Sequence, residues 1–334
     1  MNDFKKHCHN LLIILVLLPL LSFHSCSRKQ SHIVHSWTER TFFVMDTFLI
    51  ISIPPEDFSD HMIEELITMV HDTDKKLNVY TIGSDLYRLR QNAGYVPVSI
   101  DSETVFILQQ AISFCQQTNG VFDITVGPLV DLYRFHEVEP YVPSKKEIDT
   151  VRPLVDYKEI VLDEINRTAF LPTKGMYIDL SGVLKGYILD KISDFFVKQD
   201  IEHFYVNFGG NLSLSLEEAL YVGIENPFNK SPQKGFFCSQ GFVSTSSATH
   251  QFFDQGTKRY SHIIHPYTGS AEPIIGSATV VTWSGIESDF LSTYFFLVGT
   301  QPDPKIQKQY VSQSSIYLYT LKEVFTIYAE HYSS

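Results

Sequence analysis

Tyr260-Ser-His-Ile-Ile-His-Pro-Tyr-Thr-Gly269 places a histidine on a short apolar run that ends in a Pro-x-Thr-Gly turn, and Glu287-Ser-Asp-Phe-Leu-Ser-Thr293 opens an apolar helix. Side chains four residues apart share one helical face, so Asp289 and Thr293 can present two hard oxygen atoms to one cation. Phosphoryl chemistry needs a base beside a magnesium site. The two stretches therefore indicate such a site, although an aspartate in a first helical turn also occurs simply because it complements the helix dipole.

Around these stretches the chain combines predicted strands with a few helices. Arg40–Ile53 is rich in β-branched and aromatic residues and predicts a strand. Apolar residues at helical spacing predict helices over Asp60–Leu77 and Ser102–Thr118, and a further helix is expected over Val183–Lys198. Residues 136–156, rich in proline and charge, predict an exposed excursion. The second half of the chain predicts a succession of strands: Phe204–Asn207, Leu220–Ile224, Gly241–Ser244, Arg259–Ile264, Ala278–Trp283, Ile316–Thr320 and Val324–Tyr328.

Strands grouped in this way, with few helices between them, favour an α+β protein over a doubly wound one. We expect two lobes of mixed β-sheet packed with helices, with the ligand site between the lobes.

The first 25 residues predict an export signal. Lys5 and Lys6 form a short basic region, and the apolar run Leu11–Leu21 is too short to span a bilayer, which takes about 20 residues. Ser25 before Cys26 predicts a bacterial lipoprotein cleavage site, with Cys26 as the lipidated first residue; the alternative is an uncleaved signal anchor. We therefore expect an exported protein that is lipid-anchored to a bacterial membrane and faces the periplasm or the cell exterior.

Residues 26–39 are expected to form a short tether, and residues 40–334 a single catalytic domain with two lobes. The net charge of −12 excludes nucleic acid as a partner, because phosphate backbones require stripes of Lys and Arg. Beyond the signal and the lipidation site, Cys115 and Cys238 are the remaining thiols. An exported location permits a disulfide between them but does not establish one, and the cysteine spacing shows no CxxC motif or zinc site.

Two further segments contain glycines at points where the backbone can approach a ligand. Asp179-Leu-Ser-Gly-Val-Leu-Lys-Gly-Tyr-Ile-Leu-Asp190 joins a glycine-containing turn to a helix start, where backbone N–H groups attract phosphate and Lys185 adds a positive charge. Asn207-Phe-Gly-Gly-Asn211 is a strand that ends in a double glycine. Each segment alone is also typical of an ordinary turn. His262 and His265 would point to opposite faces of a strand, which argues against a shared zinc ion.

A series of motifs follows along the chain: Phe43-Val-Met-Asp-Thr47, Gly120-Val-Phe-Asp123, Asp179-Leu-Ser-Gly-Val-Leu-Lys-Gly186, Asn207-Phe-Gly-Gly210, Ser244-Thr-Ser-Ser247, His262-Ile-Ile-His-Pro-Tyr-Thr-Gly269 and Asp289-Phe-Leu-Ser-Thr293. In their order and approximate spacing they resemble the ApbE family of flavin transferases, the FAD:protein FMN transferases, which are often exported lipoproteins. The resemblance covers about residues 40–300. The ordered set is specific, whereas any single motif is not.

The resemblance implies an enzyme that uses Mg²⁺ to cleave the pyrophosphate of FAD, passes FMN to a threonine or serine hydroxyl of a target protein and releases AMP. It implies that Asp289, Thr293 and the backbone carbonyl of Leu184 bind the metal. It also implies that His262 is the base that takes the proton from the acceptor hydroxyl, which agrees with the need to remove a proton and to neutralise the charge of the pyrophosphate.

The same resemblance assigns the residues that hold the donor. Met45 and Asp123 match positions that line the flavin site, and Asp179 and Lys185 match the loop that contacts the nucleotide. The implied partners are FAD as substrate, the membrane through the lipid anchor, and acceptor subunits of membrane redox complexes such as sodium-pumping quinone reductases.

Four segments depart from the family pattern. Met-Gly-Thr is Met45-Asp46-Thr47 here, and Thr-Ser-Gly is Thr245-Ser246-Ser247. The pattern His-Ile-x-Asp-Pro-Arg is His262-Ile-Ile-His265-Pro266-Tyr267, and an Asn expected after Ser84-Asp85 is Arg90, with Asn92 close by. These changes surround the flavin pocket and leave the metal pair and His262 in place, so we expect an active enzyme.

Two other functions would use the same residues. A magnesium-dependent FAD pyrophosphatase would replace the protein hydroxyl with water and give FMN and AMP. A non-catalytic, lipid-anchored flavin-binding protein would hold or deliver FAD without chemistry.

Overall fold

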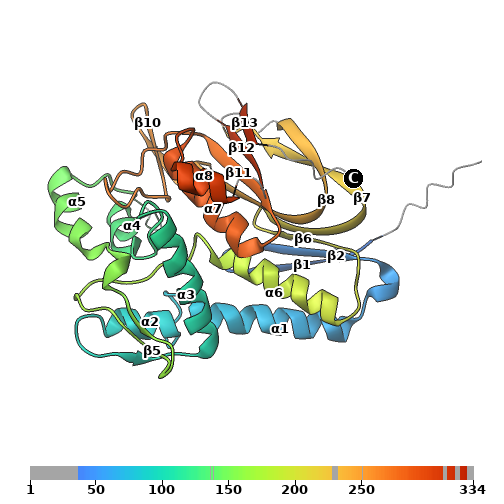
Figure 1. The fold of residues 1–334 in the computed structure, drawn as a ribbon, viewed down its shortest axis with the longest axis horizontal. Coiled ribbons are helices and arrows are strands. Elements are labelled where there is room, and N and C mark those ends of the chain that lie inside the picture. The colour runs from blue at the N-terminus through green and yellow to red at the C-terminus, as the bar shows by residue number, and fades with distance from the viewer. Residues whose placement is uncertain are drawn as a thin grey trace, which may run out of the picture. The chain divides into compact units, whose positions relative to one another are not determined.

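An eight-stranded sheet forms the centre of the fold (Figure 1). The computed structural model describes residues 37–135, 137, 139–227, 232–249, 251–310, 314–319 and 324–328, and for residues 232, 233 and 324–328 it describes the backbone alone. The predicted signal, Cys26 and nearly all of the predicted tether lie outside the described residues. The sheet order is β1 (Thr38–Val44), β2 (Thr47–Ile53), β6 (Phe204–Phe208), β7 (Asn211–Glu225), β8 (Pro232–Ser247), β11 (Ser277–Thr282), β12 (Ser315–Tyr319) and β13 (Val324–Tyr328).

The first two strands form a tight hairpin. Arg40–Ile53 was expected to be one strand, but the chain reverses at Met45 and Asp46, so that Val44 pairs with Thr47. Both turn residues have left-handed backbone angles, with φ of 52° and 56°. Asp adopts this conformation more readily than most residues because its short side chain can bond locally. The aspartate at the family's glycine position therefore fits the backbone that the turn requires.

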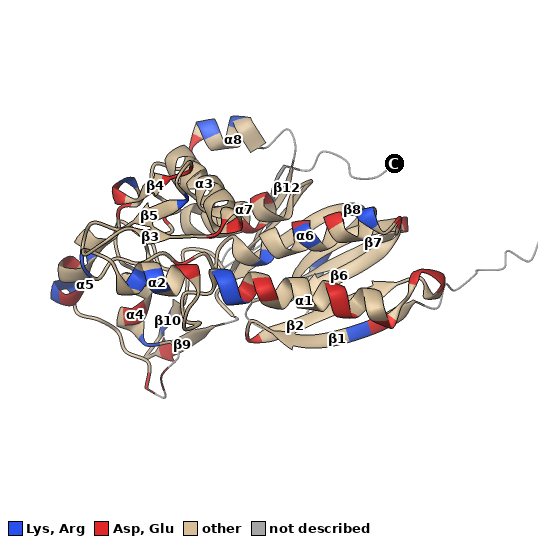
Figure 2. Ribbon diagram, turned by 90° about the horizontal axis from the view of Figure 1, so that it is seen from below, with Lys and Arg blue, Asp and Glu red and all other residues tan. Residues whose placement is uncertain are grey.

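Two helices cover one face of the sheet. α6 (Leu184–Lys198) contacts β6, β7 and β8, and α7 (Gly285–Val298) contacts β8 and β11. α1 (Asp60–Leu77) lies beside α6, and acidic and basic side chains both occur along its exposed surface (Figures 1 and 2). α7 is buried on nearly all sides, which explains why most of its residues are apolar. The predicted helices over Asp60–Leu77 and Val183–Lys198 are confirmed, to within one residue at the start of the second.

The remaining elements lie outside the large sheet and the helices α1, α6 and α7. They are α2 (Asp85–Gln91), α3 (Ser102–Gln117), α4 (Gly127–Tyr133), α5 (Lys145–Val151) and α8 (Pro304–Tyr310), the small sheet β3 (Val98–Ser99), β5 (Thr168–Phe170) and β4 (Val161–Asp163), the hairpin β9 (Phe252–Gln255) and β10 (Lys258–Ser261), and the 3₁₀ turns η1 (Pro55–Asp57), η2 (Arg152–Leu154) and η3 (Tyr157–Glu159). α3 confirms the helix expected over Ser102–Thr118.

The structure adds two short helices to what the sequence predicted and corrects one predicted strand. The exposed excursion over residues 136–156 contains α5, whose N-terminus is closed by a capping box in which Ser144 and Glu147 bond each other's backbone N–H groups. α4 begins at Gly127 with a proline in its first turn and was not expected. The strand predicted over Arg259–Ile264 ends at Ser261, so His262 lies in the loop that follows β10.

The α+β fold class is confirmed. The strand pairings among the described residues are antiparallel throughout, rather than mixed, and one large sheet dominates. Residues 36–334 form one compact unit, and the division into two lobes remains a prediction. Within the described part of the chain, no helix has the length and apolarity needed to cross a bilayer. Cys115 and Cys238 are both buried and unpaired.

Candidate functional site

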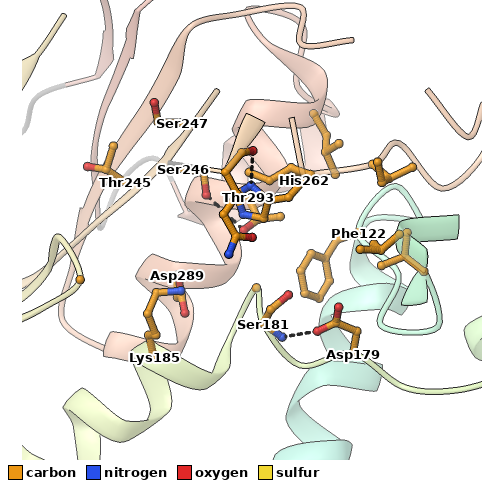
Figure 3. Close-up of a pocket in the computed structure, with 18 of the residues that line it drawn as sticks. Phe122, Asp179, Ser181, Lys185, Thr245, Ser246, Ser247, His262, Asp289 and Thr293 are labelled. Atoms are coloured by element: carbon orange, nitrogen blue, oxygen red, sulfur yellow. Dashed lines mark hydrogen bonds between the residues drawn. The ribbon is translucent and has the colours of Figure 1, made fainter. Parts of the chain in front are cut away.

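A cavity of about 460 Å³ opens where α6, α7, β8 and the β1–β2 turn meet. Its size lies within the range typical of small-molecule sites, roughly 300–1,000 Å³. Figure 3 shows side chains of α6, α7 and β8 and of the loop that carries Phe122 arranged around one space. The predicted site residues that line it are Met45, Asp123, Asp179, Lys185, His262, Asp289 and Thr293. The structure thus brings together seven of the eight residues expected around the donor, the metal and the reacting hydroxyl.

The cavity is rich in negative charge. Among the described residues that line it, four are aspartates and one is a lysine: Asp46, Asp123, Asp179, Asp289 and Lys185. An anionic pyrophosphate would be repelled by such a surface, since like charges at close range disfavour binding in a partly enclosed site. A bound cation would remove this conflict.

Asp289 and Thr293 lie one helical turn apart on α7, and both face the cavity (Figure 3). Asp289 is 4% exposed; its Oδ2 accepts a hydrogen bond from the Gly186 backbone N–H at 3.0 Å, and its Oδ1 accepts one from Asn211 Nδ2 at 2.9 Å. These bonds fix the carboxylate, while each oxygen keeps a further lone pair for a cation.

The donor set fits a hard cation with few protein ligands. The described residues contain no cluster of three or more His, Cys, Asp or Glu side chains that could enclose a metal. One carboxylate and one hydroxyl suit Mg²⁺, which keeps several waters and usually takes one or two carboxylates together with substrate phosphates. Leu184 is the predicted site residue that does not line the cavity, and its side chain is buried in the core. Its backbone lies in the same turn as Gly186, and the role of its carbonyl remains a prediction.

The N-termini of α6 and α7 are joined at a glycine contact. A Cβ atom added to Gly186 would lie 2.0 Å from the Gly285 carbonyl oxygen, and one added to Gly285 would lie 2.3 Å from the Gly186 carbonyl oxygen. Neither helix is capped by its own N-cap side chain. Instead, Asp190 of α6 accepts hydrogen bonds from the backbone N–H groups of Gly285 at 2.6 Å and Ile286 at 2.8 Å. These contacts hold the first turn of the helix that carries Asp289.

His262 projects into the cavity from the loop after β10, close to Thr293 (Figure 3). Its Nδ1 lies 3.1 Å from the carbonyl oxygen of Gln251. A carbonyl only accepts hydrogen bonds, so Nδ1 carries the proton in the neutral ring and Nε2 carries the basic lone pair. This tautomer suits a general base.

His265 does not line the cavity. Its Nδ1 accepts a hydrogen bond from the Tyr267 backbone N–H at 3.3 Å, and burial lowers the pKa of its imidazole. Its structural surroundings are therefore those of a turn residue, consistent with the expectation that the two histidines face different ways.

On the side expected to hold the flavin, Met45 and Asp123 both line the cavity. Burial raises the pKa of Asp123, although hydrogen bonds from Thr125 and from the Tyr157 backbone oppose the shift. Its Oδ1 accepts from the Thr125 N–H at 2.8 Å and its Oδ2 from the Tyr157 N–H at 3.1 Å. Asp123 thus holds its own loop in shape as well as forming part of the wall.

Asp179 and Lys185 lie at the two ends of the segment that leads into α6, and the Asp179 N–H donates to the Ile124 carbonyl at 2.7 Å, beside the loop that carries Asp123. Asp179 Oδ1 accepts a hydrogen bond from the Ser181 N–H at 2.8 Å, which closes the turn that leads into the helix (Figure 3). Lys185 lies in the first turn of α6 and, like Asp289, lines the cavity. A lysine at a helix N-terminus is well placed to meet a phosphate group.

Three of the residues that depart from the family pattern make contacts that the structure describes. Arg90 donates to Asp131 Oδ2 at 2.8 Å and stacks over the Tyr177 ring, and it does not line the cavity. Ser247 does line the cavity, and its hydroxyl bonds the Thr249 hydroxyl at 2.7 Å. Tyr267 is exposed and donates its hydroxyl to the Asn119 carbonyl.

Sequence reasoning did not identify the residues that hold Asp289, Thr293 and the start of α7 in place. Asn211 bonds Asp289, Ser246 bonds Thr293, and Asp190 bonds the start of α7. These contacts join positions 78, 47 and 95 residues apart, so no local spacing reveals them. Asn211, Ser246 and Asp190 each lie in one of the sequence motifs described above, and that position was the one signal in the sequence that pointed to them.

Comparison with known proteins gives a consistent result. A sequence model of the ApbE family matches residues 45–316. The chain is 29% identical to the FAD:protein FMN transferase of Vibrio cholerae over 71% of this chain and 73% of that protein. It is 27% identical to the FAD:protein FMN transferase of Escherichia coli K12 over 92% of this chain and 91% of that protein. The crystal structure of the ApbE protein from Thermotoga maritima has the same fold, with a TM-score of 0.80 and 23% identity, covering 87% of this chain and 96% of that one.

Proposed function

The chain belongs to the ApbE family and is a transferase, and on this premise we propose that it transfers FMN from FAD to a threonine or serine hydroxyl of a target protein. The proposed reaction depends on Mg²⁺ and releases AMP.

One observation carries this proposal. Asp289 and Thr293, one turn apart on α7, share a cavity with His262 and with Lys185 at the start of α6. A hard-cation site, a basic imidazole nitrogen and a lysine ammonium group are the groups that phosphoryl transfer to a hydroxyl requires. Their meeting in one cavity supports this chemistry over simple flavin binding.

In the proposed reaction, the acceptor hydroxyl oxygen forms a bond to the phosphorus of the FMN half. The bond from that phosphorus to the bridging oxygen breaks, and AMP leaves with that oxygen. His262 Nε2 takes the proton of the hydroxyl, while the bond from Nδ1 to the Gln251 carbonyl holds the ring in the required orientation. Lys185, at the start of α6, would bind the phosphate oxygens with its ammonium group.

Asp289, Thr293 and the Leu184 carbonyl would hold the metal. When bound, Mg²⁺ would neutralise charge on the pyrophosphate and thereby offset the repulsion from the four aspartates that line the cavity. Met45 and Asp123 would line the flavin end, and Asp179 would shape the loop towards the nucleotide.

We further propose that the protein is exported and lipid-anchored through Cys26, which lies outside the described residues. Its acceptors would then be subunits of membrane redox complexes, such as those of sodium-pumping quinone reductases. Replacing Cys26 with serine should release the protein from membranes or leave its precursor unprocessed. Unchanged migration and membrane partitioning of Cys26→Ser would instead favour a retained signal anchor.

Incubation of the purified protein with FAD and Mg²⁺, with and without an acceptor protein, tests the proposed activity. Transfer predicts a flavin-fluorescent acceptor band together with AMP. Equal release of FMN and AMP in both reactions, without a fluorescent acceptor, would identify a pyrophosphatase. FAD that stays intact in both reactions would indicate a binding protein.

A further inference from the structure

We propose that Ser292 and Ser246 fix the direction of the Thr293 hydroxyl, so that its oxygen lone pairs, and not its proton, face the metal position. Both serines would be positioning residues that act through Thr293. The proposal rests on the metal site of the proposed function, and it concerns side chains for which no role was expected from the sequence.

The geometry is a chain of three hydroxyl groups between strand β8 and helix α7. Ser292 Oγ donates a hydrogen bond to the Asp289 carbonyl oxygen at 2.9 Å. Ser246 Oγ lies 2.8 Å from Ser292 Oγ and 3.2 Å from Thr293 Oγ1 (Figure 3 shows the bond to Thr293). Ser292 is fully buried and Ser246 is 8% exposed, so water competes little for these bonds.

The donor-to-acceptor direction of these hydrogen bonds follows from counting protons, because each hydroxyl group has one proton to donate. The proton of Ser292 goes to the Asp289 carbonyl, which can only accept. Ser292 must therefore accept from Ser246, and Ser246, having used its own proton, must accept from Thr293. The Thr293 proton thus points towards Ser246, away from the cavity.

This direction matters because a cation is attracted by oxygen lone pairs and repelled by a hydroxyl proton. With the proton directed at Ser246, the lone pairs of Thr293 remain for the cation that Asp289 would also bind. In the reversed direction, Ser246 would donate to Thr293, and Thr293 would turn its proton towards the cavity. The carbonyl of Asp289 opposes this reversal, since the buried bond from Ser292 would be lost.

The same helix and strand provide a matched control one turn earlier. Ser288 donates to the Gly285 carbonyl at 2.9 Å, and Ser244 lies 2.7 Å from Ser288. Both are fully buried. Ser288 and Ser244 have the same two bonds as Ser292 and Ser246, but they form no hydrogen bond with Thr293 among the described residues. Neither of them lines the cavity.

The test measures Mn²⁺ binding to the purified protein without FAD, by electron paramagnetic resonance of the unbound ion. We expect Ser292→Ala to weaken Mn²⁺ binding by roughly 10-fold, at the lower end of the effect of removing a residue that orients a metal ligand. Ser288→Ala should bind Mn²⁺ as the wild type does. Ser246→Ala and Ser244→Ala form a second pair with the same expectation, which serves if Ser292→Ala does not fold.

A double-mutant cycle separates positioning from general loss of stability. In a Thr293→Val background the hydroxyl chain has no end group, so adding Ser292→Ala should not weaken Mn²⁺ binding further. The proposal is overturned if Ser292→Ala and Ser288→Ala weaken binding equally, if neither does, or if the effect of Ser292→Ala persists in the Thr293→Val background. Failure of the wild type itself to bind Mn²⁺ would overturn both the proposed positioning of Thr293 and the metal site of the proposed function. The other outcomes affect the positioning of Thr293 alone.

Discussion

Asp190 and Asp289 each bind the N-terminus of the other's helix. Asp190 of α6 accepts from the N–H groups of Gly285 and Ile286 at the start of α7, and Asp289 of α7 accepts from the N–H of Gly186 at the start of α6. Carboxylates at helix N-termini are favourable because they satisfy backbone donors and complement the helix dipole. Each helix therefore supplies the carboxylate that caps the other, and these two contacts hold the helix that carries the proposed metal ligands.

The first prediction concerns the pH dependence that Asp190 adds to stability. Burial raises the pKa of Asp190 from 3.8 to about 6, although the N–H groups of Ile286 and Gly285 oppose the shift. Because the folded protein holds this proton more tightly than the unfolded chain, the stabilisation is fully present below pH 3.8 and is lost as the pH rises through about 6. Relative to Asp190→Asn, the wild type should lose up to about 3 kcal/mol over this window.

Chemical denaturation of the wild type and Asp190→Asn between pH 4 and pH 7 measures this difference. The comparison cancels the opposite contributions of carboxylates such as Glu103, whose pKa is lowered by Lys191 and Lys76 despite its burial. A stability difference that is constant, or that rises with pH, would contradict the assignment.

The second prediction is that Asp289→Asn abolishes magnesium-dependent cleavage of FAD while the protein remains folded. The amide can keep one hydrogen bond to its neighbours, but it removes the charge on which a hard cation depends. Release of AMP at saturating Mg²⁺ is the measurement, and thermal unfolding is the control for folding. Glu287→Gln on the same helix, outside the cavity, should retain activity. Wild-type activity of Asp289→Asn would show that the metal is held elsewhere.

The third prediction separates the two histidines. His262→Ala should slow flavinylation of an acceptor by about 10²- to 10⁴-fold, the usual cost of losing a positioned base. FAD binding should survive, because the base contacts the incoming hydroxyl rather than the donor. His265→Ala should cost much less, since His265 bonds its own turn and does not line the cavity. A flavinylation time course with one acceptor compares them, and the reverse order of effects would mean that the base has been assigned to the wrong histidine.

The fourth prediction concerns the glycine contact between α6 and α7. In Gly285→Ala the new methyl group would meet the Gly186 carbonyl at 2.3 Å, so the helices must separate. We expect a loss of about 1–3 kcal/mol in the free energy of unfolding, accompanied by weaker Mn²⁺ binding because Asp289 moves with α7. Gly210→Ala is a useful contrast: its Cβ meets nothing within 4 Å, and its φ of +93° makes the cost one of backbone strain. Equal Mn²⁺ affinity in Gly285→Ala and the wild type would show that the contact does not position the site.

Local patterns in the sequence predicted the long helices well. Asp60–Leu77 is an amphipathic helix capped by Ser59, and the apolar spacing alone located both of its ends. The β1–β2 hairpin was harder, because Met45-Asp46 lacks the Asn-Gly or Asp-Gly signal of a tight turn. β7 and β8 were predicted only in fragments, since their pairing shifts register between Ser215 and Leu220 and alternation is interrupted there.

The candidate site also contains residues that the sequence indicated and residues that it did not. Asp289, Thr293 and His262 were selected from motifs, and the structure places all three in one cavity, while their roles remain predictions. Their supports, Ser292 and Asp190, act through buried hydrogen bonds to distant segments. Such bonds depend on how α6, α7 and β8 meet, and that relationship arises only from tertiary packing.

The spread of the cavity wall along the chain has a consequence for folding. The wall takes residues from Met45 in the first hairpin to Leu297 near the end of α7, and β2 must pair with β6 more than 150 residues away before the turn at Met45 faces Gly209. Contacts between segments so distant in sequence close large loops and form slowly. A partly folded chain therefore contains no smaller version of the site, which is complete only when α7 has packed against the sheet.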